Sequence, residues 1–371
     1  MKVPYFDLSR SHQRFVAEAQ AAFDHILKSG AYILGPALKE LEAEFASYIG
    51  TKHALGVGSG TDALIFALRA LDIKKGDEVI VPSFTFTATA LAVLHVGATP
   101  VFADVLPETF NLAPESVVQA VTPKTRAIIP VHLFGQCADM TALMALAKRM
   151  KLKVVEDACQ AHGAMWNKVM AGAFGNAGCF SFYPTKNLGG VGDGGMVTTS
   201  DEEILKRIIQ YRNLGKGIED PFVHDEIGWT SRLDSLQAAF LSIKLKFLDE
   251  LNRERRAVAA MYHKKLAKTP LILPREVPGA YHVYHLYVVR VPCGKRNALK
   301  ESLAAKGIPT MVHYATPVHG QPIMKKFMTR KMKLPVTDTL CEEVLTLPLF
   351  PGMTEPEVGA VSVAIQQFYG R

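Results

Sequence analysis

Short apolar runs alternate with segments of helical periodicity over roughly the first 200 residues. The runs that we interpret as strands cover residues 52–58, 78–82, 100–105, 126–135, 153–158, 177–183 and 194–200. Helices are predicted at 12–28, 37–49, 63–71 and 87–95, the third of them apolar nearly all round and capped by Ser59 or Thr61. Apolar strands that alternate with helices predict an α/β fold with a large, mostly parallel sheet covered on both faces.

The pattern changes after a long helix-compatible segment at about residues 233–267. A proline-rich link follows, and residues 282–292 alternate as a half-exposed antiparallel strand does. The next helix should stop at Gly307 and Pro309. Because 371 residues exceed what one small core needs, we expect two domains. We predict a large α/β domain over residues 1–245 and a smaller C-terminal α+β domain over residues 246–371.

Composition is that of an ordinary globular protein, with 49% apolar and 21% charged residues. No apolar stretch is long enough for a transmembrane helix, and residues 1–15 lack the apolar core of a signal peptide. The five cysteines form no CxxC pair, which argues against a zinc site and a disulfide framework. These features predict a cytoplasmic protein without a metal centre.

The chain is basic, with a formal net charge of +7 and a pI near 9.0. Its densest basic cluster, Arg253, Arg255 and Arg256, is interleaved with Glu250 and Glu254, as on a solvated helix face. The sequence therefore favours neither a nucleic acid nor a membrane as a partner, although the charge suits an anionic small substrate.

Residues 179–196, CFSFYPTKNLGGVGDGGM, carry the most distinctive candidate chemistry. An apolar run ends at Pro184, Lys186 follows, and five glycines come within the next nine residues. Asp157 ends an earlier apolar strand, at the edge where open α/β sheets bind ligands. Alone, Lys186 is more often a surface lysine and Asp157 a helix cap. Together they are what pyridoxal phosphate requires: a lysine to attach to and a carboxylate at its ring nitrogen.

A phosphate group would find donors at Gly58–Thr61, where backbone N–H groups precede a helix. Ser181 adds a hydroxyl, and Phe86 offers a flat face for stacking, although a capped helix and a core phenylalanine are the simpler interpretations. Gly56 and Gly58 begin a dinucleotide fingerprint, but Thr61 replaces its third glycine. An NAD-dependent oxidoreductase is therefore disfavoured.

At these residues the chain resembles the DegT/DnrJ/EryC1/StrS family of PLP-dependent sugar aminotransferases. The motifs are SGTDAL (59–64), GDEVIVPSFTFTATA (76–90), PVHLFGQCADM (130–140), EDACQAHGA (156–164), FSFYPTKNLGGVGDGG (180–195) and SRLDSLQAAFL (231–241). The resemblance covers nearly the whole chain. It implies the aspartate-aminotransferase-like fold (fold type I) and the cofactor pyridoxal 5′-phosphate.

The resemblance also implies roles for particular residues. Lys186 would attach the cofactor, Asp157 would pair with its pyridine nitrogen and Gln160 would lie near its ring hydroxyl. Phe86 would stack on the ring, while Gly60, Thr61 and Ser181 would hold the phosphate. Thr230 stands where the family has an asparagine that reaches the phosphate in the neighbouring subunit, and its shorter side chain weakens that expectation.

Within the family, FYPTKNLG and the late HYATPVH (313–319) are most like the branch that aminates C3 of dTDP-3-keto-6-deoxyhexoses. Lysine at 186, rather than histidine, favours transamination over dehydration. The implied partners are L-glutamate, a nucleotide-linked ketosugar and a second subunit, since the family forms homodimers with shared active sites. Thr230 and Tyr32 would act in the neighbouring subunit's site. Candidates for sugar contact are Tyr183, His313, Tyr314 and His319, for which packing is an equally good explanation.

Alternatives remain open at the level of the sequence. One is amination at C4 of a nucleotide sugar, and another is amination of an aminocyclitol precursor. A non-catalytic PLP-binding regulator is a third, against which the intact Lys186 and Asp157 pair speaks.

Overall fold

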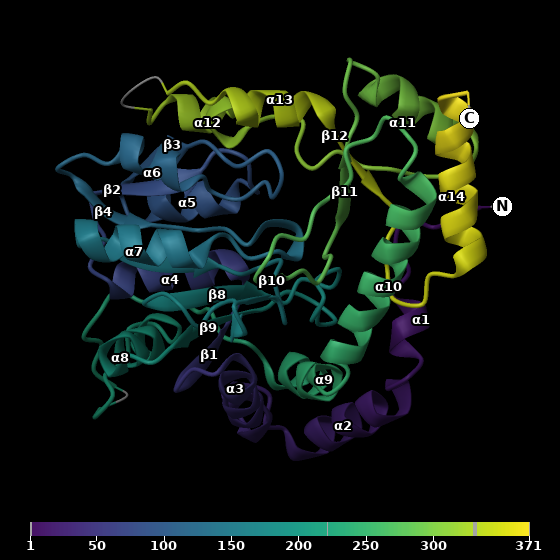
Figure 1. Ribbon diagram of the computed structural model, residues 1–371. Helices are drawn as coiled ribbons and strands as arrows, with labels where there is room; N and C mark the ends of the chain where they lie inside the picture. Colours follow the sequence, from purple (N-terminus) through teal and green to yellow (C-terminus); the bar gives the residue numbers. More distant parts are fainter. Residues whose placement is uncertain (1, 221, 329–331, 371) are drawn as a thin grey trace.

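The computed structural model describes residues 2–220, 222–328 and 332–370 (Figure 1). Within these ranges the central sheet has the strand order β1-β9-β8-β5-β4-β2-β3. Its strands are β1 (His53–Val57), β2 (Glu78–Pro82), β3 (Thr99–Ala103), β4 (Thr125–Ile128), β5 (Lys153–Asp157), β8 (Ala177–Ser181) and β9 (Gly195–Thr199). The neighbours from β3 to β8 are parallel, and β9 runs antiparallel to both β8 and β1. The predicted mostly parallel α/β sheet is confirmed.

The helices of the sheet region are α1 (Ser9–His12), α2 (Val16–Ser29), α3 (Pro36–Ile49), α4 (Gly60–Ala70), α5 (Ala88–His95), α6 (Pro114–Ala120), α7 (Met140–Met150), α8 (Glu202–Tyr211) and α9 (Ser235–Leu245). The C-terminal part contains α10 (Leu248–Leu266), α11 (Arg296–Ala305), α12 (Pro322–Lys325), α13 (Pro335–Glu343) and α14 (Glu355–Phe368). It also contains β11 (Tyr287–Arg290) paired with β12 (Val344–Leu347), while β10 (Ala280–Tyr281) joins a small sheet with β6 (Met165–Trp166) and β7 (Val169–Met170). Two 3-10 helices are η1 (Leu133–Gly135) and η2 (Val318–Gly320).

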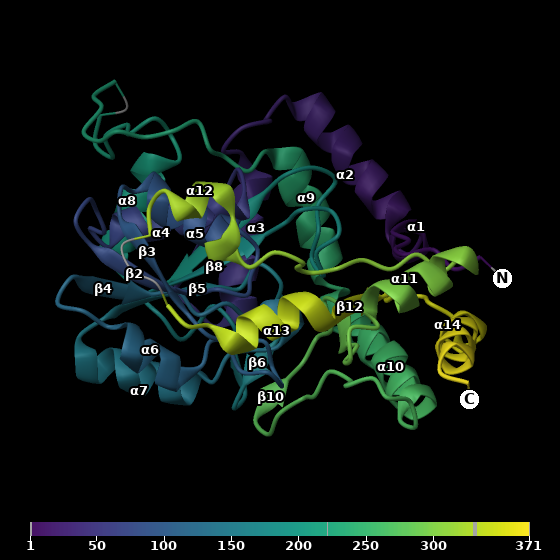
Figure 2. The same cartoon turned by 90° about the horizontal axis from the view of Figure 1, so that it is seen from above.

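Successive residues of the sheet serve opposite cores, because side chains of a strand alternate between its faces. Val79 and Val81 pack with α4, α5 and α8, whereas Ile80 between them packs with α6 and α7. Figure 2 shows these two helical layers on opposite sides of the strands. The continuous apolar runs in the sequence reflect this burial on both faces. Because helices cover both faces, the ends of the strands are the part of the sheet left open for a site.

A separate apolar core joins α10, α11, α14, β11 and β12 at the other end of the molecule (Figure 1). Val3 from the N-terminus belongs to that core. The helix-compatible segment at 233–267 is divided, since α9 ends at Leu245 and α10 begins at Leu248. The domain boundary at residue 246 stays a prediction, and Val3 suggests that a C-terminal domain would also include the first residues of the chain.

Two of the predicted strands are wrong in extent. Strand β4 ends at Ile128, and Leu133–Gly135 form a 3-10 turn instead, because Pro130 has no N–H with which to continue a ladder. In the 282–292 run only Tyr287–Arg290 form a strand, and its residues are largely buried. Tyr284 has a left-handed φ of 44°, which an extended strand cannot contain.

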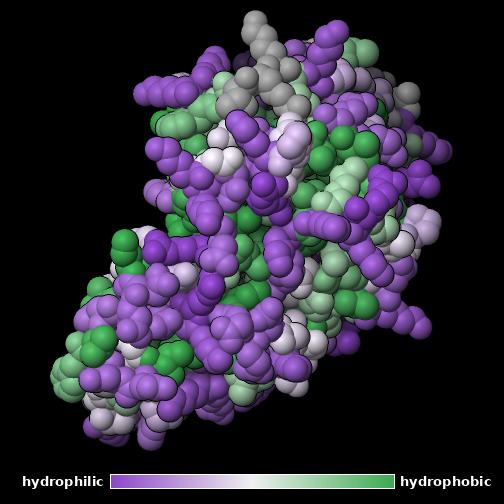
Figure 3. Space-filling model, turned by 90° about the vertical axis from the view of Figure 1, so that its left-hand side faces the viewer, coloured by the Kyte–Doolittle hydropathy of each residue, from purple (hydrophilic) through white to green (hydrophobic). Residues whose placement is uncertain are grey.

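Hydrophilic residues cover most of the face shown in Figure 3, with hydrophobic residues in small groups between them. In the described parts of the chain, no helix is both long and apolar enough to cross a membrane. The more exposed hydrophobic residues include several from one connection between α8 and α9, among them Phe222 at 92% and Ile227 at 74% exposure.

Candidate active site

The candidate site lies where two neighbouring parallel strands end. In the register of β5 and β8, Asp157 stands opposite Cys179, two residues before Ser181. Both strands therefore deliver their last residues to the same edge of the sheet. After β8 the chain turns, with the Lys186 N–H donating to the Tyr183 carbonyl at 2.8 Å. This turn places Lys186 beside the end of β5, where Asp157 is near enough for its charge to affect the lysine.

The Asp157 carboxylate is buried and held in a fixed orientation. Its Oδ2 accepts a hydrogen bond from the Thr89 hydroxyl at 2.7 Å, and its Oδ1 accepts one from the Cys159 N–H at 3.2 Å. A carboxylate has about four acceptor positions, so these two bonds leave room for a further donor. Asp157 can therefore accept the N–H of a protonated pyridine ring.

Lys186 is the amine that faces this carboxylate. Among the described residues its Nζ has no hydrogen-bond or ion-pair partner, and the residue is half-buried. Burial lowers the pKa of Lys186 below its ordinary value of 10.5, and electrostatic interactions with Cys159 and Asp157 oppose part of that shift. A lysine that loses its proton more easily is a better nucleophile toward a carbonyl carbon.

Glu156, the neighbour of Asp157 in sequence, has a different role. Its carboxylate is fully buried and accepts backbone N–H groups from Gly172, Phe174 and Gly175 at 2.7 to 2.8 Å. His132 donates to it through Nε2 at 2.9 Å, since His132 Nδ1 accepts from a backbone N–H. With its acceptor positions filled, Glu156 anchors a loop, and Asp157 is the carboxylate open to chemistry.

The start of α4 forms an anion site. The Ser59 side chain caps the helix by accepting from the Asp62 N–H at 3.1 Å. The N–H groups of Gly60 and Thr61 have no partner among the described residues. A Cβ atom on Gly60 would lie 2.8 Å from both the Cys159 Sγ and the Ser181 Cβ. Gly60 and Ser181 therefore meet, and only glycine permits this approach of free N–H groups to the serine.

Two further candidate residues, Phe86 and Gln160, supply an exposed aromatic ring and an amide. Phe86 is 58% exposed, with its ring centroid 6.2 Å from that of Tyr314. Gln160 accepts from the Phe134 N–H at 2.9 Å and donates to the Tyr314 hydroxyl at 3.2 Å. Phe86 has a free face on which a flat ring can stack, and Gln160 is fixed between the sheet region and the C-terminal part.

His313 and Tyr314 come from the C-terminal part of the chain. The His313 Nδ1 lies 2.8 Å from the Thr346 hydroxyl. Burial, with a further contribution from the charge of Lys186, lowers the pKa of His313 to about 4. His313 is thus close to Lys186 and neutral at physiological pH. The site is built from both parts of the chain.

Four of the candidate residues lie apart from this group or at its margin. His319 bonds to the Ser83 hydroxyl at 2.5 Å and packs on Phe102, which favours the packing interpretation. Thr230 is exposed and pairs with Asn213, and the hydroxyl of Tyr32 donates to the Leu27 carbonyl at 3.4 Å. Tyr183, on the lysine turn, is 53% exposed. The proposed roles of these four residues stay predictions.

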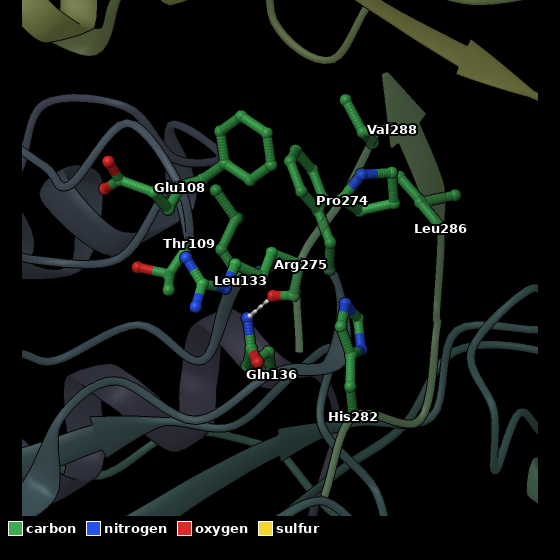
Figure 4. A pocket seen from close by; sticks show the side chains of 11 residues that line it. Glu108, Thr109, Leu133, Gln136, Pro274, Arg275, His282, Leu286 and Val288 are labelled. Carbon is green, nitrogen blue, oxygen red and sulfur yellow. Dashed lines mark hydrogen bonds between the residues drawn. The ribbon is translucent and has the colours of Figure 1, made fainter. Parts of the chain in front are cut away.

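Two cavities elsewhere do not contain these residues. One, of about 10 Å³, lies between Phe110, Leu133 and Val288, and in Figure 4 the Gln136 amide beside it donates to the Arg275 carbonyl at 3.0 Å. It has room for about one water molecule. An open groove of about 560 Å³, lined by Arg256, His263 and Tyr284 among others, lies on the surface of the C-terminal part. Neither is the site of the lysine chemistry.

Comparison with known families decides what this arrangement is. The model of the DegT/DnrJ/EryC1/StrS aminotransferase family matches residues 13–366. The chain belongs to this family. The family predicted from the motifs is therefore confirmed, and so is the assignment of the protein as a transaminase.

Similar proteins cover the whole chain. It is 45% identical to a dTDP-3-amino-3,4,6-trideoxy-alpha-D-glucose transaminase of Streptomyces venezuelae, over 100% of this chain and 97% of that protein. It is 44% identical to a pleiotropic regulatory protein of Geobacillus stearothermophilus, over 100% and 99%. It is 42% identical to a UDP-N-acetyl-3-dehydro-alpha-D-glucosamine 3-aminotransferase of Acidithiobacillus ferrooxidans, over 98% and 97%. The crystal structure of S. venezuelae DesV with a ketimine intermediate has a TM-score of 0.95 at 44% identity, covering 100% and 99%.

The cofactor is pyridoxal 5′-phosphate, which similar chains of known structure contain in its PLP or PMP form. The residues of this family member fit it on four points. They supply an unpartnered amine at Lys186, a carboxylate with spare acceptor capacity at Asp157, free N–H groups at Gly60 and Thr61, and an exposed ring at Phe86.

Sequence reasoning missed two residues of the site. Thr89 looks like any polar residue of a buried helix, and Cys159 like a structural cysteine, yet both contact Asp157. Thr89, the next-to-last residue of the motif PSFTFTATA, gave no signal, because its bond joins residues 68 positions apart. Its partner could be found only from the fold.

Proposed function

We propose that this aminotransferase transfers an amino group from L-glutamate to C3 of a dTDP-linked 3-keto-6-deoxyhexose. The observation that carries the transfer chemistry is the half-buried Lys186 amine beside the Asp157 carboxylate, an amine without a hydrogen-bond partner among the described residues. The choice of C3 is supported by FYPTKNLG at the lysine and by the names of relatives whose products carry a 3-amino group.

Lys186 is the base and acid of the proposed reaction. Because burial lowers its pKa, Lys186 gives up its proton more easily than an exposed lysine does. The amine takes a proton from the carbon that bears the nitrogen of the donor. In the second half of the reaction it delivers a proton to the sugar carbon that becomes aminated. When bound, the cofactor supplies an electron-withdrawing ring that makes these protons acidic.

Other residues of the chain hold the reactants for Lys186. Asp157 would keep a proton on the pyridine nitrogen of the bound cofactor, and Thr89 holds the Asp157 carboxylate in place. The N–H groups of Gly60 and Thr61, with the Ser181 hydroxyl, would bind the phosphate at the positive end of α4. Phe86 would cover one face of the ring, and Gln160 would lie near the ring hydroxyl.

The sugar would bind between the lysine turn and the C-terminal part. The exposed Tyr183 and the pair His313 and Tyr314 border this space from opposite parts of the chain. Their hydroxyl and imidazole groups suit the hydroxyl groups of a hexose. We extend the proposal to His319 only as a residue that supports the 313–319 segment through Ser83.

A homodimer with shared sites is part of the proposal. Tyr32 and Thr230 are exposed in the single chain, and neither reaches the lysine turn of its own subunit through any bond in the described residues. The connection from 214 to 229 exposes Phe222 and Ile227, as a surface covered by a second copy does. Location in the cytoplasm is supported by the five cysteines, all of which are free.

The test is a substrate screen with the intact protein. Purified enzyme and glutamate are incubated with 3-keto- and 4-keto-6-deoxyhexoses linked to dTDP, UDP or GDP, with a UDP-linked 2-acetamido-3-ketosugar and with a keto-cyclitol, and the position of the new amine is determined by NMR. We expect the dTDP sugar to be aminated at C3, with 2-oxoglutarate released in equal amount. Amination at C4 alone, or turnover confined to an aminocyclitol precursor, would refute the proposal. Lys186→Ala is the inactive control.

Two similar proteins favour other outcomes of the same screen. The likeness to a UDP-N-acetyl-3-dehydro-alpha-D-glucosamine 3-aminotransferase would make a UDP-linked 2-acetamido ketosugar the substrate. The likeness to a pleiotropic regulatory protein would make the chain a PLP-binding regulator. The regulator would be supported by a yellow protein whose cofactor becomes fixed to Lys186 on borohydride treatment, but which aminates no ketosugar linked to any of the nucleotides.

A further inference from the structure

The turn that carries Lys186 is held from outside the sheet by buried polar side chains. Within the turn, Gly190 N–H donates to the Phe182 carbonyl at 2.8 Å, and a Cβ on Gly189 would lie 2.2 Å from the Pro184 carbonyl oxygen. The backbone after Lys186 therefore folds back tightly on the backbone before it. The position of the amine depends on what fixes Asn187 and Gly189, the residues that close this turn.

Lys244 fixes Gly189. It lies in the last turn of α9, is only 2% exposed, and donates from Nζ to the Gly189 carbonyl at 2.9 Å. In the described chain no carboxylate lies within ion-pairing distance of it. Burial and the charge of Arg255 lower the pKa of Lys244 to about 7. The chain thus keeps a buried amine at a cost in desolvation, and the one hydrogen bond of that amine to a described residue is to the lysine turn.

Asn252 fixes Asn187. It lies in the first half of α10 and is 1% exposed. Its Oδ1 accepts from the Asn187 Nδ2 at 2.7 Å, and its Nδ2 donates to the His162 carbonyl at 2.9 Å. Asn187 also donates to the Val283 carbonyl at 3.2 Å. The residue next to Lys186 is therefore tied to α10 and to the C-terminal segment that precedes β11.

We propose that Lys244 and Asn252 are positioning residues, which hold the turn at Asn187 and Gly189 so that the Lys186 amine meets the cofactor. They stand on either side of the break between α9 and α10 at Lys246 and Phe247. A stability role alone does not account for Lys244, because replacing a buried charge by an apolar side chain of similar shape is often neutral or stabilising. A displacement of about 1 Å at a reacting group can cost on the order of 100-fold in rate.

The test compares Lys244→Met with Lys246→Met. Lys246 is two residues away on the same chain segment, is exposed, and pairs with Glu18 at 3.3 Å. Each protein is prepared without cofactor and mixed with pyridoxal phosphate, and the growth of the visible absorption band reports attachment to Lys186. Borohydride reduction and peptide mapping identify the lysine. Thermal midpoints and kcat and KM for glutamate are measured on the same samples.

We expect Lys244→Met to fold with nearly the parent's thermal midpoint, to attach the cofactor about 10-fold to 100-fold more slowly and to lose kcat in similar proportion, with little change in the KM for glutamate. Lys246→Met should match the parent in all of these. Asn252→Leu should behave like Lys244→Met, with Asn297→Leu, at an exposed position of α11, as its control. Because attachment needs no sugar, the result is independent of the proposed substrate.

Three outcomes would overturn the proposal. Unchanged attachment and kcat in both Lys244→Met and Asn252→Leu would remove any positioning role. Equal losses in Lys246→Met would make the effect one of net charge. A Lys244→Met protein that does not fold would make Lys244 a structural residue only.

Discussion

At the scale of residues, the site depends on a few bonds between groups far apart in the sequence. Lys186 and Asp157 were predictable, because their spacing from apolar strands and the motifs around them indicate the chemistry directly. Thr89, Lys244 and Asn252 were not, since each looks like an ordinary helix residue until the fold brings it to its partner. The sequence pattern therefore predicts the reactive residues more reliably than it predicts the residues that hold them in place.

Thr89→Val tests this distinction at Asp157. Valine keeps the shape of threonine but removes the hydroxyl that donates to Asp157 Oδ2 at 2.7 Å. A hydrogen bond to a charged group contributes about 1.5–3 kcal/mol, so we expect kcat to fall about 10-fold or more while the protein remains folded. Steady-state kinetics and the absorption spectrum of the bound cofactor measure the change. Thr89→Ser should restore activity; a Val variant with the parent's kcat would show that the bond is unimportant.

At the scale of elements, the predicted helices and strands were mostly right and their ends mostly were not. The apolar helix expected from residue 63 begins at Gly60, because Ser59 is the cap and the first turn is polar. The strand expected at 126–135 stops before Pro130, and the run at 282–292 is broken by the left-handed Tyr284. The break between α9 and α10 has no proline or glycine to announce it. The site residues lie at the ends of helices and strands, so the errors in the predicted ends affect the functional region.

Gly60→Ala tests the first turn of α4. Alanine is a better helix former than glycine by about 1 kcal/mol, so propensity alone predicts a gain in stability. The added Cβ would lie 2.8 Å from Cys159 Sγ and from Ser181 Cβ, and must push the phosphate donors away from Ser181. We expect the dissociation constant of pyridoxal phosphate to rise at least about tenfold, measured by titration of the apo-protein.

The matched control is Gly359→Ala in α14, where a Cβ would meet no atom within 4 Å. It should leave cofactor affinity unchanged and raise the thermal midpoint or leave it as it is. If both alanine variants bind the cofactor as tightly as the parent does, close packing at Gly60 is not needed for the phosphate site.

At the scale of the whole molecule, the N-terminus and the C-terminal part stabilise each other. Arg10 in α1 makes two bonds of 2.8 Å to the Glu357 carboxylate in the first turn of α14, and its guanidinium lies 5.1 Å from the centre of the Phe350 ring. Glu357 also completes a capping box with Thr354. Since His313 and Tyr314 belong to the same C-terminal part, this contact supports the side of the site that would hold the sugar.

This contact should make stability depend on pH in the acid range. The bonds from Arg10 lower the pKa of Glu357 from 4.5 to about 2. Because the folded state favours the ionised carboxylate, the stabilisation is fully present above about pH 4.5 and is lost as the pH falls toward 2.

The variant Arg10→Met removes the partner of Glu357. Its thermal midpoint should lie below the parent's by a constant amount from pH 5 to 7. That difference should shrink steadily from pH 4.5 toward 2, as measured by calorimetry. Arg253→Met, which alters an exposed arginine on α10, should show no such convergence. A difference between Arg10→Met and the parent that stays the same down to pH 2 would mean that Arg10 acts through its packing on Phe350 rather than through Glu357.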